Sequence, residues 1–418
     1  LPETIPEYLI KEYKLMDINE ATKQIHFPNS FEDYNRARTR LVFEELLIMQ
    51  LALLTVKTNY DKDKKGISFS TDAKMSEIID SLPFKLTNAQ SRVLEEIDKD
   101  MESKKTMNRL LQGDVGSGKT AVAMCAAFKA VRSNYQATVM VPTAILATQH
   151  YQNFKKTMDK FDIRCELLIS GMAKKQKEKI LEELKQGKID IIIGTHALLQ
   201  ENVEFNKLGL VITDEQHRFG VRQRSIINLK GENPDVLVMS ATPIPRTLAL
   251  ILYGDLDISI IDELPPNRQK IDTFAVTASK EERVNNFIKG QIDEGRQAYV
   301  VCPLVEESDE INAKSVLEIA EKYKNEIFKD YRVEYIHGKL NKKDKEAIME
   351  EFKNGKIDIL ISTTVIEVGV DVPNASIMVI ENAERFGLAT LHQLRGRVGR
   401  GKYKSYCILK YKGNRRKY

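Results

Sequence analysis

A glycine-rich segment of the sequence has the residue types and spacing that bind phosphate. Residues 113–120 read Gly-Asp-Val-Gly-Ser-Gly-Lys-Thr and fit the pattern G-x-x-x-x-G-K-[ST]. Glycines let backbone N–H groups close around phosphate oxygens, while Lys119 can reach the outer phosphates and the Thr120 hydroxyl can ligate Mg²⁺. The segment therefore predicts a nucleotide phosphate site with a magnesium ion. Its predicted contributors are Gly113, Gly116, Ser117, Gly118, Lys119 and Thr120.

Two adjacent carboxylates follow a short apolar run. Residues 210–213 read Leu-Val-Ile-Thr, and Asp214 and Glu215 come next. A buried strand would deliver both side chains to its carboxyl end, where ligands bind in parallel α/β sheets. Asp214 can hold the Mg²⁺, and Glu215 can orient and deprotonate the attacking water. The alternative for Asp214 is a solvated acid at a strand end; the pair favours hydrolysis of the nucleotide.

The second half of the chain contains no copy of the glycine-rich pattern but offers paired arginines. Residues 393–400 read Gln-Leu-Arg-Gly-Arg-Val-Gly-Arg, which makes Arg397 and Arg400 the candidates. A rigid guanidinium can stabilise the charge that develops on a transferred phosphate, with rate effects of ~10³–10⁵. The alternative is a basic helix face. If these arginines complete the site from a second lobe, we expect the gap between lobes to close on nucleotide binding and to relax after hydrolysis.

Small polar segments follow several predicted strands in both halves of the chain. Their hydroxyls and backbone N–H groups could hold a phosphodiester backbone without reading its bases. Each segment alone is equally typical of an ordinary turn, so the prediction depends on their repetition at matching places. The candidate residues are Thr143, Thr195, His196, Gly338, Thr363 and Thr364. His217, close after the two carboxylates, joins them.

These residues need elements that bring them together, and the chain has the alternating pattern of an α/β protein. Residues 1–83 are predicted to be helical, because apolar residues recur at helical spacing over 35–57. Short β-rich runs then alternate with helical segments, which favours parallel sheets. Pro265 and Pro266 indicate a hinge. We therefore expect a helical segment (1–83) followed by two tandem parallel-sheet lobes, the first nucleotide-binding (84–265) and the second at 266–418. The predicted strands are 109–112, 138–141, 189–193, 210–213, 236–239, 298–302, 333–336, 357–361, 377–380 and 406–409.

A repeated sequence links the two predicted lobes. Residues 187–196 read Gly-Lys-Ile-Asp-Ile-Ile-Ile-Gly-Thr-His, and residues 355–364, which lie 168 positions later, read Gly-Lys-Ile-Asp-Ile-Leu-Ile-Ser-Thr-Thr. Coincidence between two buried strands is the alternative. The shared Gly-Lys-Ile-Asp lead-in favours two copies of one α/β unit. At the same offset Asn382 takes the place of Asp214, so the second lobe is not expected to hydrolyse nucleotide by itself.

Composition and charge exclude several classes of protein. The 418 residues are 42% hydrophobic and 30% charged, as in a soluble multidomain protein rather than a disordered or fibrous one. Four scattered cysteines favour a reducing, cytoplasmic compartment over a disulfide framework or zinc site. No membrane span or leader is predicted. The net charge of +4 hides a basic end, because residues 385–418 carry eleven basic and no acidic residues. This end could strengthen binding to a nucleic-acid backbone.

Together these motifs resemble those of superfamily 2 helicases, and more narrowly the RecG family of bacterial branched-DNA translocases. The resemblance covers nearly all of residues 1–411. It implies two RecA-like lobes, ATP and Mg²⁺ as cofactors, and a monomeric ATP-dependent motor on branched or duplex DNA. The parent protein would unwind and remodel stalled replication forks and Holliday junctions in recombination and repair. The segments that carry the resemblance are 84–90 (Phe-Lys-Leu-Thr-Asn-Ala-Gln), 112–120, 214–220 (Asp-Glu-Gln-His-Arg-Phe-Gly), 240–246 (Ser-Ala-Thr-Pro-Ile-Pro-Arg), 363–373 and 393–400.

The resemblance also implies roles for further residues. Gln90 resembles the helicase glutamine that recognises adenine. A side-chain amide can form two hydrogen bonds with one edge of this base, which suits that role. Ser240 and Thr242 resemble the motif that couples hydrolysis to movement along DNA. The other residues implied at the nucleotide site are Phe84, Gly369, Asp371 and Gln393.

Three alternatives stay open. The transcription-repair coupling translocase shares this motor, but residues 214–217 read Asp-Glu-Gln-His where that family usually has Asp-Glu-Glu-Gln, which favours RecG. An RNA helicase of the same superfamily is the second alternative. No β-rich wedge domain precedes Leu1, and the chain stops at Tyr418 before a helical hairpin, so we expect a motor core without these RecG accessories. The third alternative is therefore an ATP-gated DNA clamp with weak turnover.

Overall fold

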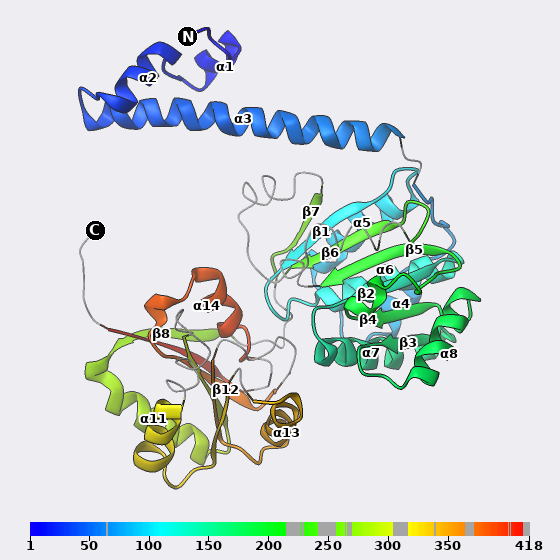
Figure 1. Ribbon diagram of the computed structural model, residues 1–418, viewed down its shortest axis with the longest axis vertical. Coiled ribbons are helices and arrows are strands. Elements are labelled where there is room, and N and C mark those ends of the chain that lie inside the picture. The colour runs from blue at the N-terminus through cyan, green and yellow to red at the C-terminus, as the bar shows by residue number, and fades with distance from the viewer. Residues whose placement is uncertain are drawn as a thin grey trace. The chain divides into compact units, whose positions relative to one another are not determined.

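A computed structural model gives the fold of most of the chain (Figure 1). It describes residues 1–63, 66–214, 227, 230–240, 256–263, 265, 270–303, 317–337, 340–363, 372–399, 401 and 403–412. The chain divides into two compact units. One contains Leu1–Lys65 and Ile244–Asp257, and the other contains Gly66–Pro243 and Ile258–Tyr418.

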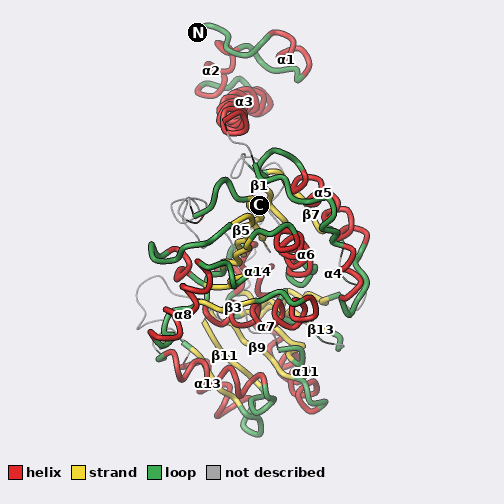
Figure 2. The backbone as a smooth tube through the Cα atoms, turned by 90° about the vertical axis from the view of Figure 1, so that its right-hand side faces the viewer, coloured by secondary structure: helices red, strands yellow, loops and turns green. Residues whose placement is uncertain are grey.

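The described part of the first unit is helical. Helices α1 and α2 lie on the same side of the long helix α3 (Figures 1 and 2). The Asp17 carboxylate starts α2 by accepting hydrogen bonds from the backbone N–H groups two and three residues later, at 2.9 and 3.2 Å. Ala21 and Ala37 are fully buried where α2 packs on α3. The helix predicted over 35–57 is thus longer at both ends. The bounds are α1 (Glu7–Glu12), α2 (Ile18–His26) and α3 (Phe31–Asp63).

The second unit begins with an irregular segment and the short helix α4, which pack into the core of the first sheet. Phe69, Met75 and Ile78 are buried in one cluster with residues of α5 and α6. Residues 66–82, which the sequence analysis grouped with the helical region before them, therefore pack with the first lobe. The helices of this lobe are α4 (Ser76–Ser81), α5 (Asn88–Glu102), α6 (Lys119–Arg132), α7 (Ala144–Met158) and α8 (Lys174–Lys185).

The first lobe contains a seven-stranded sheet with the order β3-β4-β2-β5-β6-β1-β7. The pairs formed among β1 to β6 are parallel. Strands β2 and β6 are buried along their whole length, as expected for a parallel sheet with covered faces. The strands are β1 (Asn108–Gly113), β2 (Gln136–Met140), β3 (Cys165–Leu168), β4 (Ile191–Gly194), β5 (Leu208–Asp214), β6 (Asp235–Ser240) and β7 (Asp257–Ile261).

The second lobe contains a six-stranded sheet with the order β10-β11-β9-β12-β13-β8, and its neighbouring strands are all parallel. The fold class predicted from sequence, two tandem parallel-sheet lobes preceded by helices, is confirmed. The elements are β8 (Ile271–Thr277), α11 (Glu281–Asp293), β9 (Gln297–Cys302), β10 (Val333–Ile336), α13 (Lys342–Lys353), β11 (Ile359–Thr363), β12 (Ala375–Ile380), α14 (Leu388–Arg395) and β13 (Ser405–Tyr411).

The two lobes repeat the same internal hydrogen bonds. Gln136 Nε2 donates to the carbonyls of Leu184 and Ile189, at 2.9 and 2.7 Å. In the second lobe Gln297 Nε2 donates to the carbonyls of Phe352 and Ile357, at 2.6 and 2.7 Å, and both acceptors lie 168 residues later in the sequence. Helices α8 and α13 also begin and end at this offset. The sequence repeat therefore corresponds to two copies of one α/β unit.

A buried carboxylate lies at the amino end of β6, far along the strand from Ser240. The Asp235 side chain is 0% exposed, and its Oδ1 accepts a hydrogen bond from Met107 N at 2.7 Å. Its Oδ2 has no partner among the described residues. Burial raises the pKa of Asp235 well above its ordinary value, because desolvation disfavours the charged form.

Candidate active site

The phosphate-binding loop connects a buried strand to a buried helix. β1 ends at Gly113, and α6 begins at Lys119 with Gly118 as its N-cap. Gly116 and Gly118 have φ values of +78° and +89°, a backbone conformation that residues other than glycine rarely adopt. The backbone therefore needs glycine at both positions. The loop places the amino-terminal turn of α6 at the carboxyl end of the sheet, where helix N–H groups attract anions.

The lysine and serine of this loop are held inside it. Lys119 Nζ donates to the carbonyls of Gly113 and Asp114, at 2.8 and 3.0 Å. The Ser117 hydroxyl is buried and has no hydrogen-bond partner among the described residues. A side chain at Gly113 would meet that hydroxyl at 2.4 Å. A buried hydroxyl, an ammonium group and helix N–H groups around one turn fit the phosphates of a nucleotide.

Gln90 connects the loop to α5. Its Oε1 accepts a hydrogen bond from Thr87 N and its Nε2 donates to the carbonyl of Ser117, both at 2.8 Å. The residue is 1% exposed, and a side chain at Gly118 would meet Nε2 at 2.1 Å. A side-chain amide has two donors and two acceptor lone pairs. The two internal bonds therefore leave one donor and one acceptor, the pair that contact with adenine requires; that role stays a prediction.

Asp214 ends β5 and contacts a histidine that the sequence did not indicate. His150 Nε2 on α7 lies 3.1 Å from Asp214 Oδ2. The two side chains are 5% and 14% exposed. His150 belongs to no recognised motif with the glycine-rich loop. Its position among apolar residues of a predicted helix did not indicate that it would contact Asp214. Only the fold, which packs α7 against the sheet, brings the two together.

The residues predicted for Mg²⁺ have the chemistry that this ion requires. Thr120 offers a hydroxyl on the first turn of α6, and Asp214 offers a carboxylate at the end of β5. Within the described ranges, no three His, Cys, Asp or Glu side chains gather into a metal cluster. Mg²⁺ in nucleotide sites usually takes only one or two protein carboxylates, with phosphate and water oxygens as its other ligands. A hydroxyl and one carboxylate therefore fit this role.

A helix of the second lobe contacts the glycine-rich loop. His392 Nε2 on α14 lies 2.9 Å from Asp114 Oδ1, and Arg395 Nη2 lies 3.8 Å from Asp114 Oδ2. A side chain at Gly396 would meet Val115 Cβ at 2.7 Å. The predicted Gln393 lies on this helix, and Arg397 comes directly after its C-cap, Gly396. The sequence indicated the glutamine and the arginine but gave no reason to expect a contact through Asp114 and His392.

The predicted backbone-binding residues have different surroundings. The Thr143 hydroxyl caps α7 by accepting a hydrogen bond from Leu146 N at 3.3 Å. Thr195 directly follows β4, and Thr363 ends β11, the equivalent strand of the second lobe. Both threonines are buried. His196 is exposed at the start of the 3₁₀ turn His196–Leu199. Ser240, the last residue of β6, is the register partner of Gln112 on β1, directly before the glycine-rich loop.

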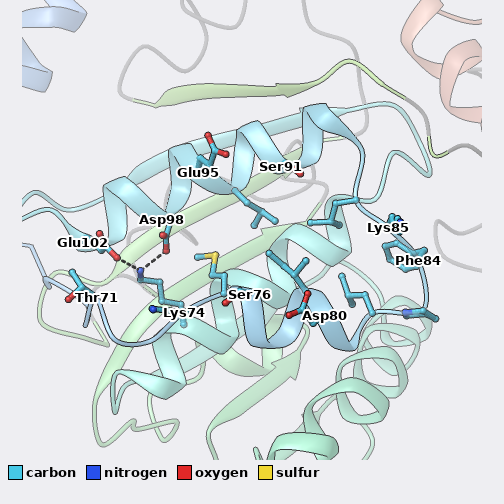
Figure 3. A pocket seen from close by; sticks show the side chains of 17 residues that line it. Thr71, Lys74, Ser76, Asp80, Phe84, Lys85, Ser91, Glu95, Asp98 and Glu102 are labelled. Atoms are coloured by element: carbon cyan, nitrogen blue, oxygen red, sulfur yellow. Dashed lines mark hydrogen bonds and ion pairs between the residues drawn. The ribbon is translucent and has the colours of Figure 1, made fainter.

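Phe84 lines a pocket of about 810 Å³ between α4 and α5 (Figure 3). The aromatic residue is 46% exposed. The Lys129 ammonium, which also lines the pocket, pairs with Asp98 and Glu102, at 2.5 and 2.7 Å. The described lining of this pocket includes no residue of 113–120. The role of Phe84 at the nucleotide stays a prediction.

Several predicted site residues lie outside the described residues. They are Glu215, His217, Thr242, Gly338, Thr364, Gly369, Asp371 and Arg400.

The four cysteines are described and buried, and burial raises the pKa of each to about 12. These thiols therefore stay protonated and are poor nucleophiles.

Comparison with known proteins places this geometry in a family. Two family models match, DEAD/DEAH box helicase over residues 87–251 and Helicase conserved C-terminal domain over residues 279–402. The chain is 50% identical over 410 residues to the ATP-dependent DNA helicase RecG of Thermotoga maritima, covering 98% of this chain and 52% of that protein. It is 50% identical over 411 residues to RecG of Bacillus subtilis, covering 98% and 60%. The chain belongs to the RecG family.

A solved structure of RecG bound to a three-way DNA junction shares the fold. It is 47% identical to this RecG-family chain, with a TM-score of 0.82, and the match covers 99% of this chain and 55% of that one. The chain thus spans between half and three-fifths of the length of these RecG relatives. Yeast Dbp5 bound to RNA is 17% identical with a TM-score of 0.58, a likeness of fold alone. Within the described ranges, every helix is too short or too polar to span a lipid bilayer.

Proposed function

We propose that the chain is an ATP-dependent motor that acts on DNA, and that the longer protein unwinds and remodels branched DNA in recombination and repair. The observation that carries the proposal is the approach of three kinds of group to one loop. Lys119 lies inside the glycine-rich turn, Gln90 supports it from α5, and α14 of the second lobe contacts it through His392 and Asp114. A loop of the first lobe that also contacts the second lobe suits a site whose chemistry is coupled to movement of the lobes.

Residues of the first lobe would bind and orient the nucleotide. The N–H groups of α6, the Ser117 hydroxyl and the Lys119 ammonium would hold its phosphates. Thr120 and Asp214 would hold Mg²⁺, which when bound neutralises phosphate charge and orients the outer phosphate. Glu215, the next residue in the sequence, would accept a proton from the attacking water. The products are ADP and phosphate.

The second lobe would contribute the arginines. Arg397 follows the helix that contacts the loop, and Arg400 lies three residues further along the sequence. A guanidinium at the outer phosphate stabilises the charge of the transition state. Its contact is lost when phosphate leaves, and this loss would let the lobes separate again. The cycle would turn hydrolysis into a step along DNA.

DNA is the polymer that the relatives favour. The RecG structure that matches over nearly the whole chain is bound to a three-way DNA junction. Three RNA-bound proteins that match are 17–20% identical and share the fold alone. The strand-end hydroxyls and the basic residues after Arg385 would contact phosphodiester groups without reading bases. We further propose that the chain acts as a monomer in the cytoplasm.

The test is ATP turnover by the full chain and by the longer protein, measured with junction DNA, duplex DNA, RNA and heparin. We expect junction DNA to stimulate turnover more than RNA or heparin. Lys119→Ala should abolish nucleotide binding, because the ammonium group that lies in the loop is removed. Equal stimulation by heparin would refute a DNA motor, and stronger stimulation by RNA would favour an RNA helicase.

A further inference from the structure

A buried histidine on α7 meets the carboxylate at the end of β5. The 3.1 Å contact between His150 Nε2 and Asp214 Oδ2 joins two side chains that are largely removed from water. Burying a polar group costs free energy unless it finds a hydrogen-bond partner, and Asp214 is the partner here. Phe154 packs against the imidazole ring, with centroids 6.4 Å apart. The other buried residues of α7 are Leu146, Ala147 and Met158.

The geometry indicates which ring nitrogen carries the proton. An aspartate carboxylate only accepts hydrogen bonds, so Nε2 must donate. Nδ1 is buried and has no hydrogen-bond partner among the described residues. The contact with Asp214 therefore uses an N–H donor on Nε2.

The topology of the sheet explains why these two residues meet. Met140 at the end of β2 is the register partner of Thr213, directly before Asp214. α7 begins at Ala144, soon after β2 ends, and its N-cap is Thr143. The buried face of α7 therefore passes the carboxyl end of β5 within its first two turns. His150, the seventh residue of α7, therefore comes within hydrogen-bond distance of Asp214.

We propose that His150 is a positioning residue for the metal of the nucleotide site, an inference that rests on the proposed function. By donating to Oδ2, the imidazole fixes the rotation of the Asp214 carboxylate, so that Oδ1 keeps one orientation. A carboxylate that ligates a metal is usually held by such a partner, and loss of the partner costs about 10- to 100-fold in metal affinity or activity. His150 itself is not assigned as a ligand, because Mg²⁺ prefers oxygen.

The test measures Mg²⁺-dependent nucleotide binding by the full chain. A fluorescent, non-hydrolysable ATP analogue is titrated in EDTA and then with increasing Mg²⁺. His150→Asn places its amide near the Nδ1 position, short of Asp214, so the Mg²⁺ concentration for half-maximal binding should rise about 10- to 100-fold. His150→Gln can place an N–H near the Nε2 position and should stay close to the wild type. Asn153→Gln, on the exposed side of α7, is the matched control.

The outcomes separate this inference from the proposed function. Wild-type Mg²⁺ dependence in a folded His150→Asn chain, or equal losses in the asparagine and glutamine variants, would overturn the positioning role. A wild-type chain that binds the analogue equally with and without Mg²⁺ would also overturn the positioning role, whereas a folded wild-type chain that binds no analogue at any Mg²⁺ concentration would overturn the proposed function instead. Thermal unfolding reports whether each variant folds. His150→Met, which leaves no polar atom in the apolar stripe, should show the same shift as asparagine and carries the test if that variant does not fold.

Discussion

Substitution of Gln90 can distinguish its two roles, which are supporting the phosphate-binding loop and capping helix α5. In the structure, Gln90 and Thr87 form a capping box at the start of α5. The Thr87 hydroxyl accepts from Gln90 N at 3.2 Å, and Gln90 Oε1 accepts from Thr87 N at 2.8 Å. Only Gln90 also bonds to the loop, through the carbonyl of Ser117. Thr87→Ala is therefore a matched control for Gln90→Ala.

The expected costs follow from the bonds that each substitution removes. Gln90→Ala removes one buried and one partly buried hydrogen bond, each worth about 1 kcal/mol, and leaves the Ser117 carbonyl and the Thr87 N–H without these partners, so we expect a loss of about 2–3 kcal/mol. Thr87→Ala removes one cap, which is worth about 1 kcal/mol. Because Gln90 Nε2 also lies against Gly118, its loss should loosen the loop itself, whereas loss of the Thr87 hydroxyl should not.

Urea unfolding of the two variants gives the free energies, and hydrogen–deuterium exchange of residues 113–120 reports on the loop. We expect faster exchange and weaker nucleotide binding in Gln90→Ala, and wild-type values for both in Thr87→Ala. Equal losses of stability in the two variants, with unchanged loop exchange in Gln90→Ala, would show that Gln90 acts only as a cap.

Three further predictions concern other parts of the molecule. Asp235→Asn should gain stability relative to the wild type as pH rises. Burial raises the folded-state pKa of Asp235, so the protonated carboxyl group stabilises the fold below its ordinary pKa of 3.8, and this contribution falls by up to about 1.4 kcal/mol per pH unit above that pKa. Urea unfolding that shows no pH dependence of the stability difference between Asp235→Asn and the wild type would contradict this. Gly396→Ala should lower ATP turnover because its Cβ would lie 2.7 Å from Val115 Cβ, and Val115→Gly, which removes that atom, should restore turnover in the double variant; failure of that rescue in steady-state assays would remove the clash as the cause. Arg400→Ala should leave ATP binding largely intact and lower turnover by ~10³-fold or more, whereas unchanged turnover would refute its role at the phosphate.

The repeating parts of the fold could be predicted from sequence because buried strands and the Gly-Lys-Ile-Asp lead-in are local signals. The predicted strands correspond to β1, β2, β4, β5, β6 and β9 to β13, with bounds that differ by a few residues. Three strands, β3, β7 and β8, gave too little signal. β3 has only four residues, and Glu166 interrupts its apolar run. β8 is partly exposed along its length and lies at the edge of its sheet, so it lacks the apolar run of a central strand.

The candidate site could be predicted only where its chemistry lies in one continuous segment. Residues 113–120 carry their own turn geometry, and the structure assigns positive φ values to Gly116 and Gly118 as that geometry requires. The contacts of His150 with Asp214 and of Asp114 with His392 join residues 64 and 278 positions apart. No local pattern encodes such pairs, because strand order and helix packing determine them.

The most direct test of the proposed motor is single-turnover hydrolysis of ATP by residues 1–418, with and without a three-way DNA junction. The account predicts that bound ATP is cleaved, that the junction raises the rate constant, and that Lys119→Ala shows no cleavage. ATP that binds but is cleaved at the same slow rate with and without DNA would contradict a motor and would indicate a nucleotide-gated clamp.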